Sequence, residues 1–282
     1  MGVIMQNLVD YSRKYGSNPE LVLAGGGNTS MKENGVLYVK GSGCALSTIN
    51  PENFVAMDMG KLLAITEKVY PDSDSEREAA FLADVSAAKL PGEEAKRPSV
   101  EALLHALFPQ RYVLHLHPAL VNGLTCGKAG EQKAAELFPD AIWVPACKPG
   151  YTLAKLLSDK IGVSTSTVLL QNHGVFFAAE TPDGLASLLD GMIETLKAQL
   201  PGPLPEDLPE ADISKPFTPD HIVYCGLGPT LPDTENARLL YRDAQKITWY
   251  SESFGGPLPL SQELVDFITH WEAESYRKKK SN

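Results

Sequence analysis

Three histidines are the residues of this chain whose type and spacing point most directly to chemistry. His115 and His117 stand in the stretch VLHLHP. Alternate residues of a strand project from one face, so both imidazoles can aim at one point while their backbones stand about seven ångströms apart. His173, in LLQNHGVFF between two strand-like runs, is the best candidate for a third donor. Since a catalytic zinc or similar ion usually takes three protein ligands, we predict a divalent metal site here.

The same histidines also have ordinary structural interpretations. Two half-buried histidines that hydrogen-bond the backbone would explain the HLH spacing about as well as a metal does, and Asn-His-Gly is an acceptable turn sequence. The metal hypothesis therefore rests on the three occurring together. Imidazole nitrogens would accept zinc, manganese, cobalt or iron. The remaining histidines are interpreted as ordinary surface or helix-packing residues, namely His105, His221 and His270.

Glu101 is the candidate proton-transfer group. It follows Ser99 at the start of an expected helix, where a serine cap and a carboxylate near the positive end of the helix dipole both have purely structural uses. If the start of this helix faces the metal, Glu101 becomes the general acid/base, because it can take or return a proton while the ion holds a substrate oxygen.

Two glycine-rich turns form a possible anion site. The run from Gly25 to Ser30 and the turn Gly41-Ser42-Gly43 could present several backbone N–H groups to a phosphate or carboxylate, and Lys40 adds a cation close by. Neither turn has the GxGxxG pattern or the terminal Lys-Ser/Thr of a phosphate-binding P-loop, so dinucleotide binding is not expected.

Alternating helices and strands are expected to position these residues. An opening helix carries Ile4, Leu8, Tyr11 and Tyr15 on one face, and Asn34-Gly35 is typical of a hairpin turn. The expected strands are 21–24, 36–40, 112–117, 142–144, 167–170 and 175–178. The expected helices lie around 76–90, 129–138 and 152–161, with one that opens at Pro98-Ser99 and a long one capped by Thr181-Pro182.

The chain is expected to divide near residue 200. Residues 1–200 would form the catalytic domain, while 201–220 contain six prolines among acidic residues, a composition that favours an extended connector. Beyond it, a helix around 234–248 and another bearing Leu264, Phe267, Ile268 and Trp271 hold too few apolar residues for an independent core. We predict that the extension 201–282 packs on the main domain or a neighbouring subunit, and that the basic run Arg277 to Lys280 is a solvated helix end.

Composition limits the classes of partner. With 282 residues the chain can bury a sizeable core without disulfides, and its formal net charge of -10 disfavours nucleic acid and anionic membranes as partners. The four cysteines show no CxxC spacing, and no stretch suggests export or a membrane span. We therefore expect a cytoplasmic protein that acts on a small molecule.

The ordered set GGGNTS, VKGSG, PSVE, HLHP and QNHG resembles the class II aldolase/adducin family over about residues 4 to 200. The resemblance implies an α/β fold, a three-layer α/β/α sandwich around a mostly antiparallel sheet. It also implies zinc held by His115, His117 and His173, with Glu101 as acid/base. In the family's sugar-phosphate aldolases, the matching loops bind the substrate phosphate; here these are Gly27, Asn28, Ser42 and Gly43, together with Ser99. Members are commonly homotetramers.

One departure from the family pattern bears on the substrate. Val100 stands where fuculose-phosphate aldolases have a second serine, so one phosphate hydrogen bond would be missing. In wording the chain is most similar to the aldolase half of bifunctional rhamnulose-phosphate aldolase/alcohol dehydrogenase proteins, and FTPDHIVYCG in the extension looks similar too. We expect a metal-dependent aldolase that acts through an enediolate on a sugar phosphate or related compound. The alternatives are an epimerase or dehydratase on the same site, or a non-catalytic adducin-like interaction module.

Overall fold

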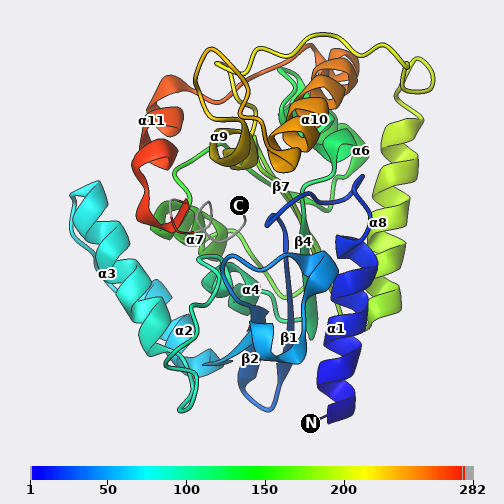
Figure 1. The fold of residues 1–282 in the computed structure, drawn as a ribbon. Helices are drawn as coiled ribbons and strands as arrows, with labels where there is room; N and C mark the ends of the chain where they lie inside the picture. Colours follow the sequence, from blue (N-terminus) through cyan, green and yellow to red (C-terminus); the bar gives the residue numbers. More distant parts are fainter. Residues whose placement is uncertain (1, 275, 277–282) are drawn as a thin grey trace.

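A seven-stranded mixed sheet forms the middle layer of the protein in a computed structural model that describes residues 2–274 and 276 (Figure 1). The strands lie in the order β3-β2-β1-β4-β7-β6-β5, and every neighbouring pair is antiparallel except β5 with β6. The strands are β1 (Asn28–Glu33), β2 (Val36–Lys40), β3 (Phe54–Asp58), β4 (Tyr112–Leu116), β5 (Ile142–Val144), β6 (Thr167–Leu170) and β7 (Gly174–Ala179).

Helices cover both faces of this sheet, which confirms the expected three-layer α/β/α architecture (Figure 1). One apolar core, on the face of α1, α5, α6 and α8, lies on the opposite side of the sheet from a second core formed with α2, α3, α4 and α7. The helices of the first 200 residues are α1 (Gly2–Gly16), α2 (Met59–Ala64), α3 (Asp74–Ala87), α4 (Ala102–Leu107), α5 (Ala119–Thr125), α6 (Gly130–Leu137), α7 (Tyr151–Ser158) and α8 (Pro182–Lys197). Short 3-10 turns are η1 (Leu46–Thr48), η2 (Pro51–Asn53) and η3 (Ile65–Glu67).

The prediction of a strand at residues 21–24 is wrong. That segment forms turns, and the strand of this region is the more polar β1, which starts at Asn28 inside the run interpreted as a glycine-rich loop. Pairing with β2 on one side and β4 on the other supplies the backbone partners of β1. Hydrophobicity did not indicate this strand, because its stability comes from those neighbours. The hairpin at Asn34-Gly35 is confirmed, with both residues at positive φ.

The extension adds three helices, α9 (Pro219–Cys225), α10 (Glu235–Ser251) and α11 (Gln262–His270), with a 3-10 turn η4 (Glu252–Phe254). Helix α10 packs on α5, and Ile247 and Tyr250 join the core of the α5 face. A Cβ added at Gly123 of α5 would lie 2.3 Å from Cβ of Tyr250, so the two helices approach closely because this position has no side chain. The division of the chain at residue 200 stays a prediction.

Two further expectations concern the proline-rich stretch and the basic run near the end of the sequence. The proline-rich stretch was predicted to run to residue 220, but α9 begins at Pro219, because proline suits the first position of a helix and Thr218 caps it. The basic run Arg277 to Lys280 lies outside the described residues, as does the side chain of Ile4. Within the described part of the chain, no helix has the length and apolar character needed to cross a membrane.

Candidate metal centre

His115 is fixed by the middle of the sheet. It lies on β4 between Asn28 of β1 and Phe176 of β7, and strand alternation turns it away from the face that buries Leu114 and Leu116. Its ring stacks on Phe176 with centroids 4.0 Å apart and planes 12° apart, and the residue has no exposed surface. The orientation of this imidazole is therefore set by packing on both sides.

His173 reaches the same place from the turn between β6 and β7. Asn172 adopts a positive φ of 57°, and its side-chain amide donates to the carbonyl of Leu258 at 2.7 Å, which ties the turn to the extension. Gly174 is required next to it, because an added Cβ would lie 2.4 Å from the carbonyl oxygen of Leu116. The turn thus brings His173 against the end of β4.

The three imidazoles converge. Each of His115, His117 and His173 offers a nitrogen, and these three atoms lie within 4.8 Å of one another. Nδ1 of His115 lies 3.0 Å from the carbonyl oxygen of Val175, and Nδ1 of His117 lies 2.6 Å from Oδ2 of Asp220. Both partners are acceptors when Asp220 is ionised, so each Nδ1 carries the hydrogen and each Nε2 presents a lone pair.

This arrangement fits a bound cation. The Nε2 atoms of His115 and His117 lie only 2.9 Å apart, and Oε1 of Glu101 stands 3.3 Å from Nε2 of His115. Two lone pairs and a carboxylate oxygen facing one point repel each other unless a positive charge lies among them. Burial lowers the pKa of His173 to about 3 despite the opposing attraction of Glu101, which keeps this imidazole in the neutral form that binds metals.

Glu101 lies at the N-cap of α4, beside the histidines, which is the position that the predicted role in proton transfer would need. Its Oε2 accepts a hydrogen bond from the side-chain amide of Asn28, while Oε1 faces Nε2 of both His115 and His173, at 3.3 and 3.5 Å. Burial raises the pKa of Glu101, but a positive charge at the histidines, first at His115 and carried by an imidazole or by an ion that the rings hold, keeps this pKa well below its usual range. The carboxyl group is therefore ionised and can accept a proton.

The glycine-rich turns line the same cavity as the histidine cluster. Its walls include most of the predicted site residues, namely Gly27, Asn28, Ser42, Gly43, Ser99, Glu101, His117 and His173. His115 lies behind them, fully buried. Several polar groups of these turns already have partners: the amide of Ser42 donates to the carbonyl of Arg97 at 2.9 Å, and that of Ser99 to the carbonyl of Lys40 at 3.2 Å. The structure thus brings the predicted residues together around one cavity.

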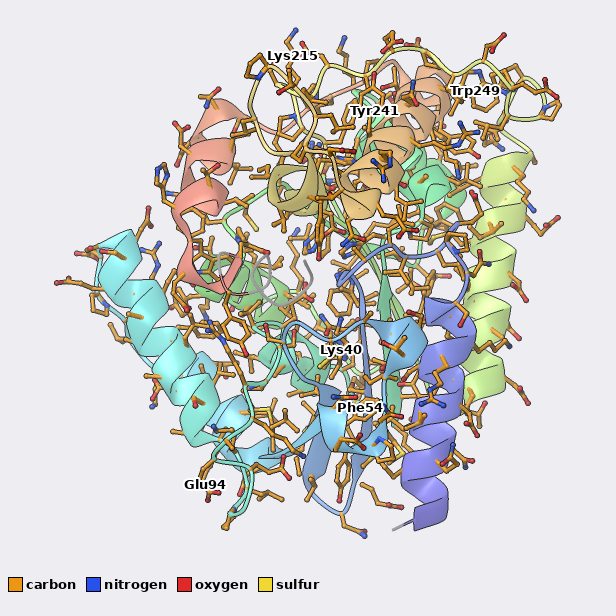
Figure 2. The ribbon with its side chains drawn as sticks, viewed as in Figure 1. Lys40, Phe54, Glu94, Lys215, Tyr241 and Trp249 are labelled. Carbon is orange, nitrogen blue, oxygen red and sulfur yellow. The ribbon has the colours of Figure 1, made fainter. Side chains whose placement is uncertain are left out.

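Lys40 also lines the cavity, so the expectation that it adds a cation beside an anionic ligand stays a prediction. Figure 2 labels Lys40 near the middle of the view and Lys215 at its upper edge. Lys40 is 2% exposed, and its ammonium donates to the carbonyls of Gly25 at 2.9 Å and Gly27 at 2.7 Å. A carbonyl-rich turn attracts a buried ammonium because three N–H donors need acceptors there. Lys40 therefore stabilises the turn.

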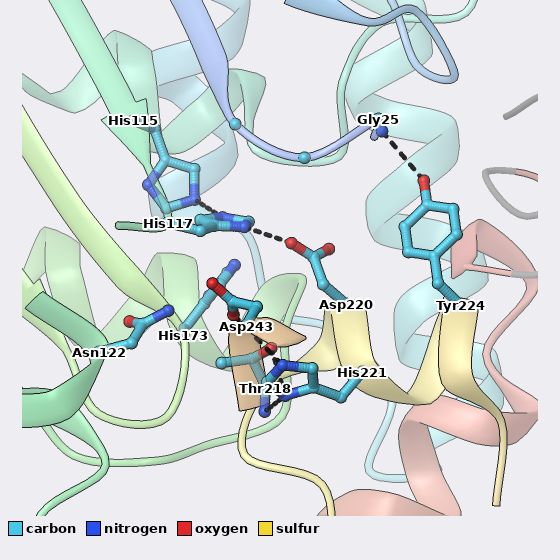
Figure 3. Close-up of polar contacts among 12 residues, drawn as sticks. Gly25, His115, His117, Asn122, His173, Thr218, Asp220, His221, Tyr224 and Asp243 are labelled. Atoms are coloured by element: carbon cyan, nitrogen blue, oxygen red, sulfur yellow. Dashed lines mark hydrogen bonds and ion pairs between the residues drawn. The ribbon is translucent and has the colours of Figure 1, made fainter. Parts of the chain in front are cut away.

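Two site residues were missed by sequence reasoning, and both belong to α9 in the extension. Figure 3 shows Asp220 pointing at His117 and Tyr224 pointing at Gly25. The backbone N–H of Gly25 donates to the Tyr224 hydroxyl at 3.1 Å. The only sequence signal for these residues was the resemblance of FTPDHIVYCG, which assigned them no roles.

The remaining histidines differ from one another. His105 is fully buried and packs in α4, with Nδ1 2.7 Å from the Ser30 hydroxyl; burial keeps its pKa well below the usual range. His221, interpreted as a surface or helix-packing histidine, is buried in α9, and its Nε2 lies 3.3 Å from Oδ2 of Asp243 on α10. His270 is exposed and contacts the backbone of its own helix.

Comparisons with known proteins agree with this geometry. Residues 6–200 match the family model described as the class II aldolase and adducin N-terminal domain. The chain is 30% identical to the uncharacterized oxidoreductase YuxG of Bacillus subtilis (strain 168) over 192 residues, which is 64% of this chain and 27% of that protein. The chain thus matches about a quarter of the length of this relative.

Solved structures share the fold. The N-terminal class II aldolase domain of a conserved protein from Thermoplasma acidophilum is 29% identical, with a TM-score of 0.59 over 68% of this chain and 91% of that domain. YgbL from Klebsiella pneumoniae is 16% identical, with a TM-score of 0.50 over 69% of this chain and 86% of its own, and this likeness concerns the fold alone.

Proposed function

Since the chain belongs to the family of the class II aldolase and adducin N-terminal domain, we propose that it is a metal-dependent aldolase. The reaction is the reversible cleavage of a carbon–carbon bond in a hydroxylated carbonyl compound, a sugar phosphate or a related hydroxy-carbonyl. The observation that carries the proposal is the convergence of three imidazole nitrogens within 4.8 Å, with the carboxylate of Glu101 beside them.

His115, His117 and His173 are the residues that would hold the ion. When bound there, a divalent ion would polarise the carbonyl and hydroxyl oxygens of the substrate and stabilise the negative charge that develops as the bond breaks. Zinc is the ion we propose, although imidazole ligands also suit other divalent transition metals. The stacking of His115 on Phe176 holds that imidazole in place before any ligand arrives.

Glu101 is the proposed acid/base. In the condensation direction its ionised carboxylate removes a proton from the carbon next to the carbonyl, and in the cleavage direction it returns the proton to that carbon. Asn28 orients the carboxylate by donating to Oε2, which leaves Oε1 on the side of the histidines. Around the rest of the cavity, Ser99, Ser42, Gly43 and Gly27 are proposed to contact the anionic end of the substrate.

The test is the variant Glu101→Gln, with Glu76→Gln on the exposed surface of α3 as the matched control. Bound metal is measured by elemental analysis, and aldol cleavage is followed on a panel of sugar phosphates and hydroxy acids. We expect Glu101→Gln to retain metal and lose about 100-fold to 10,000-fold in turnover, while the control matches the wild type. Undiminished turnover in Glu101→Gln contradicts the proposed role.

Product analysis and metal content separate this proposal from its rivals. An epimerase or dehydratase using the same cluster would give a stereoisomer or a dehydrated product in place of two fragments. A non-catalytic interaction module has no reason to retain a stoichiometric metal ion. Assembly as a homotetramer and a cytoplasmic location accompany the proposal and can be checked by light scattering and by fractionation of cells.

A further inference from the structure

The carboxylate of Asp220 enters the histidine cluster from a helix more than one hundred positions further along the chain. We propose that Asp220 is a positioning residue that prepares His117 to bind the metal, so that the extension is part of the metal centre. This inference rests on the proposed function, because it assumes that the three histidines hold an ion.

The contact fixes which nitrogen of His117 is available. Oδ2 of Asp220 lies 2.6 Å from Nδ1 of His117, and both side chains are buried. The ionised carboxylate accepts the Nδ1 hydrogen, which leaves the lone pair on Nε2, the atom that faces His115 at 2.9 Å. A carboxylate in this position also makes the imidazole a more basic ligand.

His115 is prepared in the same way, but by the backbone. Its Nδ1 lies 3.0 Å from the carbonyl oxygen of Val175 in the neighbouring strand. Two of the three histidines thus have an acceptor behind them, one supplied by the sheet and one by a side chain of the extension. Only the second acceptor belongs to a side chain and can be removed by substitution. Variants of Asp220 can therefore test whether an acceptor behind the imidazole matters for metal binding.

Helix α9 is anchored so that Asp220 points inward. At its first turn, the Thr218 hydroxyl and the His221 ring form a reciprocal cap in which the Thr218 backbone N–H donates to Nδ1 of His221 at 3.3 Å. Nε2 of His221 therefore carries the hydrogen and faces Oδ2 of Asp243 on α10 at 3.3 Å (Figure 3). At the other end, the Tyr224 hydroxyl accepts from Gly25.

The first glycine-rich turn leaves room for this pair. An added Cβ at Gly26 would lie 2.9 Å from Oδ2 of Asp220 and 3.1 Å from Nδ1 of His117. Because Gly26 has no side chain, the backbone of the turn can lie directly over the hydrogen bond between Asp220 and His117. Shielded from water, the bond between carboxylate and imidazole is stronger than an exposed one.

The experiment compares zinc affinity of the full-length protein and two variants, Asp220→Asn and Asp220→Ala, by competition with a chromophoric chelator. We expect Asp220→Ala to bind zinc about 10-fold to 100-fold more weakly, and Asp220→Asn, which keeps a neutral acceptor, to lie between it and the wild type. The matched control is Asp233→Asn, the same change at an exposed carboxylate of the extension, which should leave zinc affinity within about threefold of the wild type.

A second measurement reports on His117 directly. Nitrogen-15 NMR of the metal-free proteins distinguishes the two neutral tautomers of a histidine ring. We expect His117 to hold the Nδ1–H tautomer in the wild type and in Asp233→Asn, and to lose this preference in Asp220→Ala. Asp220→Asn keeps the shape of the side chain, so it carries the test if Asp220→Ala fails to fold.

The outcomes separate the two proposals. If the wild type binds stoichiometric zinc and both Asp220 variants bind it equally well with an unchanged tautomer, the role of Asp220 is overturned and the aldolase proposal stands. If the wild type itself retains no metal, both proposals are overturned. Weakened binding in the Asp220 variants alone supports the inference.

Discussion

The two ends of the candidate cavity are built in different ways. We call the end at the three histidines the metal end, and the end at the two glycine-rich turns the loop end. At the metal end, polar atoms from distant parts of the chain converge on one point, and the Nε2 atoms of His115 and His117 face each other at 2.9 Å. At the loop end, the amide of Ser42 and the ammonium of Lys40 are already engaged by carbonyls of the protein.

This difference indicates that the metal end needs a bound ligand more than the loop end does. The metal end has lone pairs that face one another and suit a positive charge, whereas at the loop end the amide of Ser42 and the ammonium of Lys40 bind carbonyls of the protein. A glycine-rich turn in a sequence does not by itself indicate an anion site, because its N–H donors can also serve the fold. At this end the hydroxyl of Ser99, which accepts from the backbone N–H of Glu101 at 3.2 Å, keeps its own hydrogen for a ligand.

The largest effect is expected at the metal end. Replacement of His173 by Ala removes one of three ligands, so metal affinity should fall by more than the 10-fold to 100-fold typical of losing a ligand's hydrogen-bond partner, and turnover should be lost. Metal content by elemental analysis and aldol cleavage measure this. The control is His270→Ala on the surface of α11, which should keep both. Full metal content in His173→Ala would remove the distinction between the two ends.

At the loop end, Lys40→Met should cost stability. The carbonyls of Gly25 and Gly27 would be left without the ammonium, and buried carbonyls without partners cost about 1–3 kcal/mol each. We expect the free energy of unfolding to fall by about 3 kcal/mol in denaturant titrations. Lys61→Met at an exposed position should stay within about 0.5 kcal/mol of the wild type. An unchanged stability in Lys40→Met would leave this lysine with the ligand-binding role alone.

A smaller loss is expected for Gly27→Ala. Gly27 has a φ of +66°, and an added Cβ would lie 2.9 Å from the carbonyl oxygen of His115, so both strain and crowding apply. We expect unfolding to become easier by about 2 kcal/mol. Gly35→Ala is the control for strain alone, since Gly35 has a φ of +77° with open space around it and should lose about 1 kcal/mol. Equal losses at both positions would show that the crowding at Gly27 has no cost.

The smallest effect is expected for Ser99→Ala. Loss of one neutral hydrogen bond, about 0.5–1.5 kcal/mol, should raise KM about twofold to tenfold for a phosphorylated substrate and leave KM unchanged for an unphosphorylated one. Steady-state kinetics on a matched pair of substrates checks this. Equal effects on the two substrates would assign Ser99 to the cap of Glu101 in place of a phosphate contact.

Much of the fold followed from local patterns. The strands that carry His115 and flank His173 have alternating or continuously apolar residues in the sequence. The start of the long helix α8 was predictable from Thr181-Pro182, a typical helix cap. These elements are predictable because each buries one face by its own periodicity. The family motifs then placed the cluster residues together, and the geometry of the three histidines agrees with that expectation.

Other features could not be predicted because their causes lie far along the chain. Strand β1 is polar and is held by its two neighbours, so residues 21–24, which are more apolar, looked more like a strand. The residues around Asp220 do not indicate its contact with His117, because an aspartate after a proline also fits an ordinary helix start. The carbonyl partners of Lys40 were also not predictable, because the sequence indicates only that a cation lies close to the turns.

The 103 positions between His117 and Asp220 have a consequence for the order in which the protein matures. A chain made from its N-terminus can assemble the sheet and gather its three imidazoles while α9 is still unsynthesised. The hydrogen bond behind His117 can form only after the proline-rich stretch and the start of α9 have emerged from the ribosome. If the three histidines hold an ion, its binding would depend on the synthesis of α9, because a chain that stops before Asp220 would offer the ion an unprepared His117.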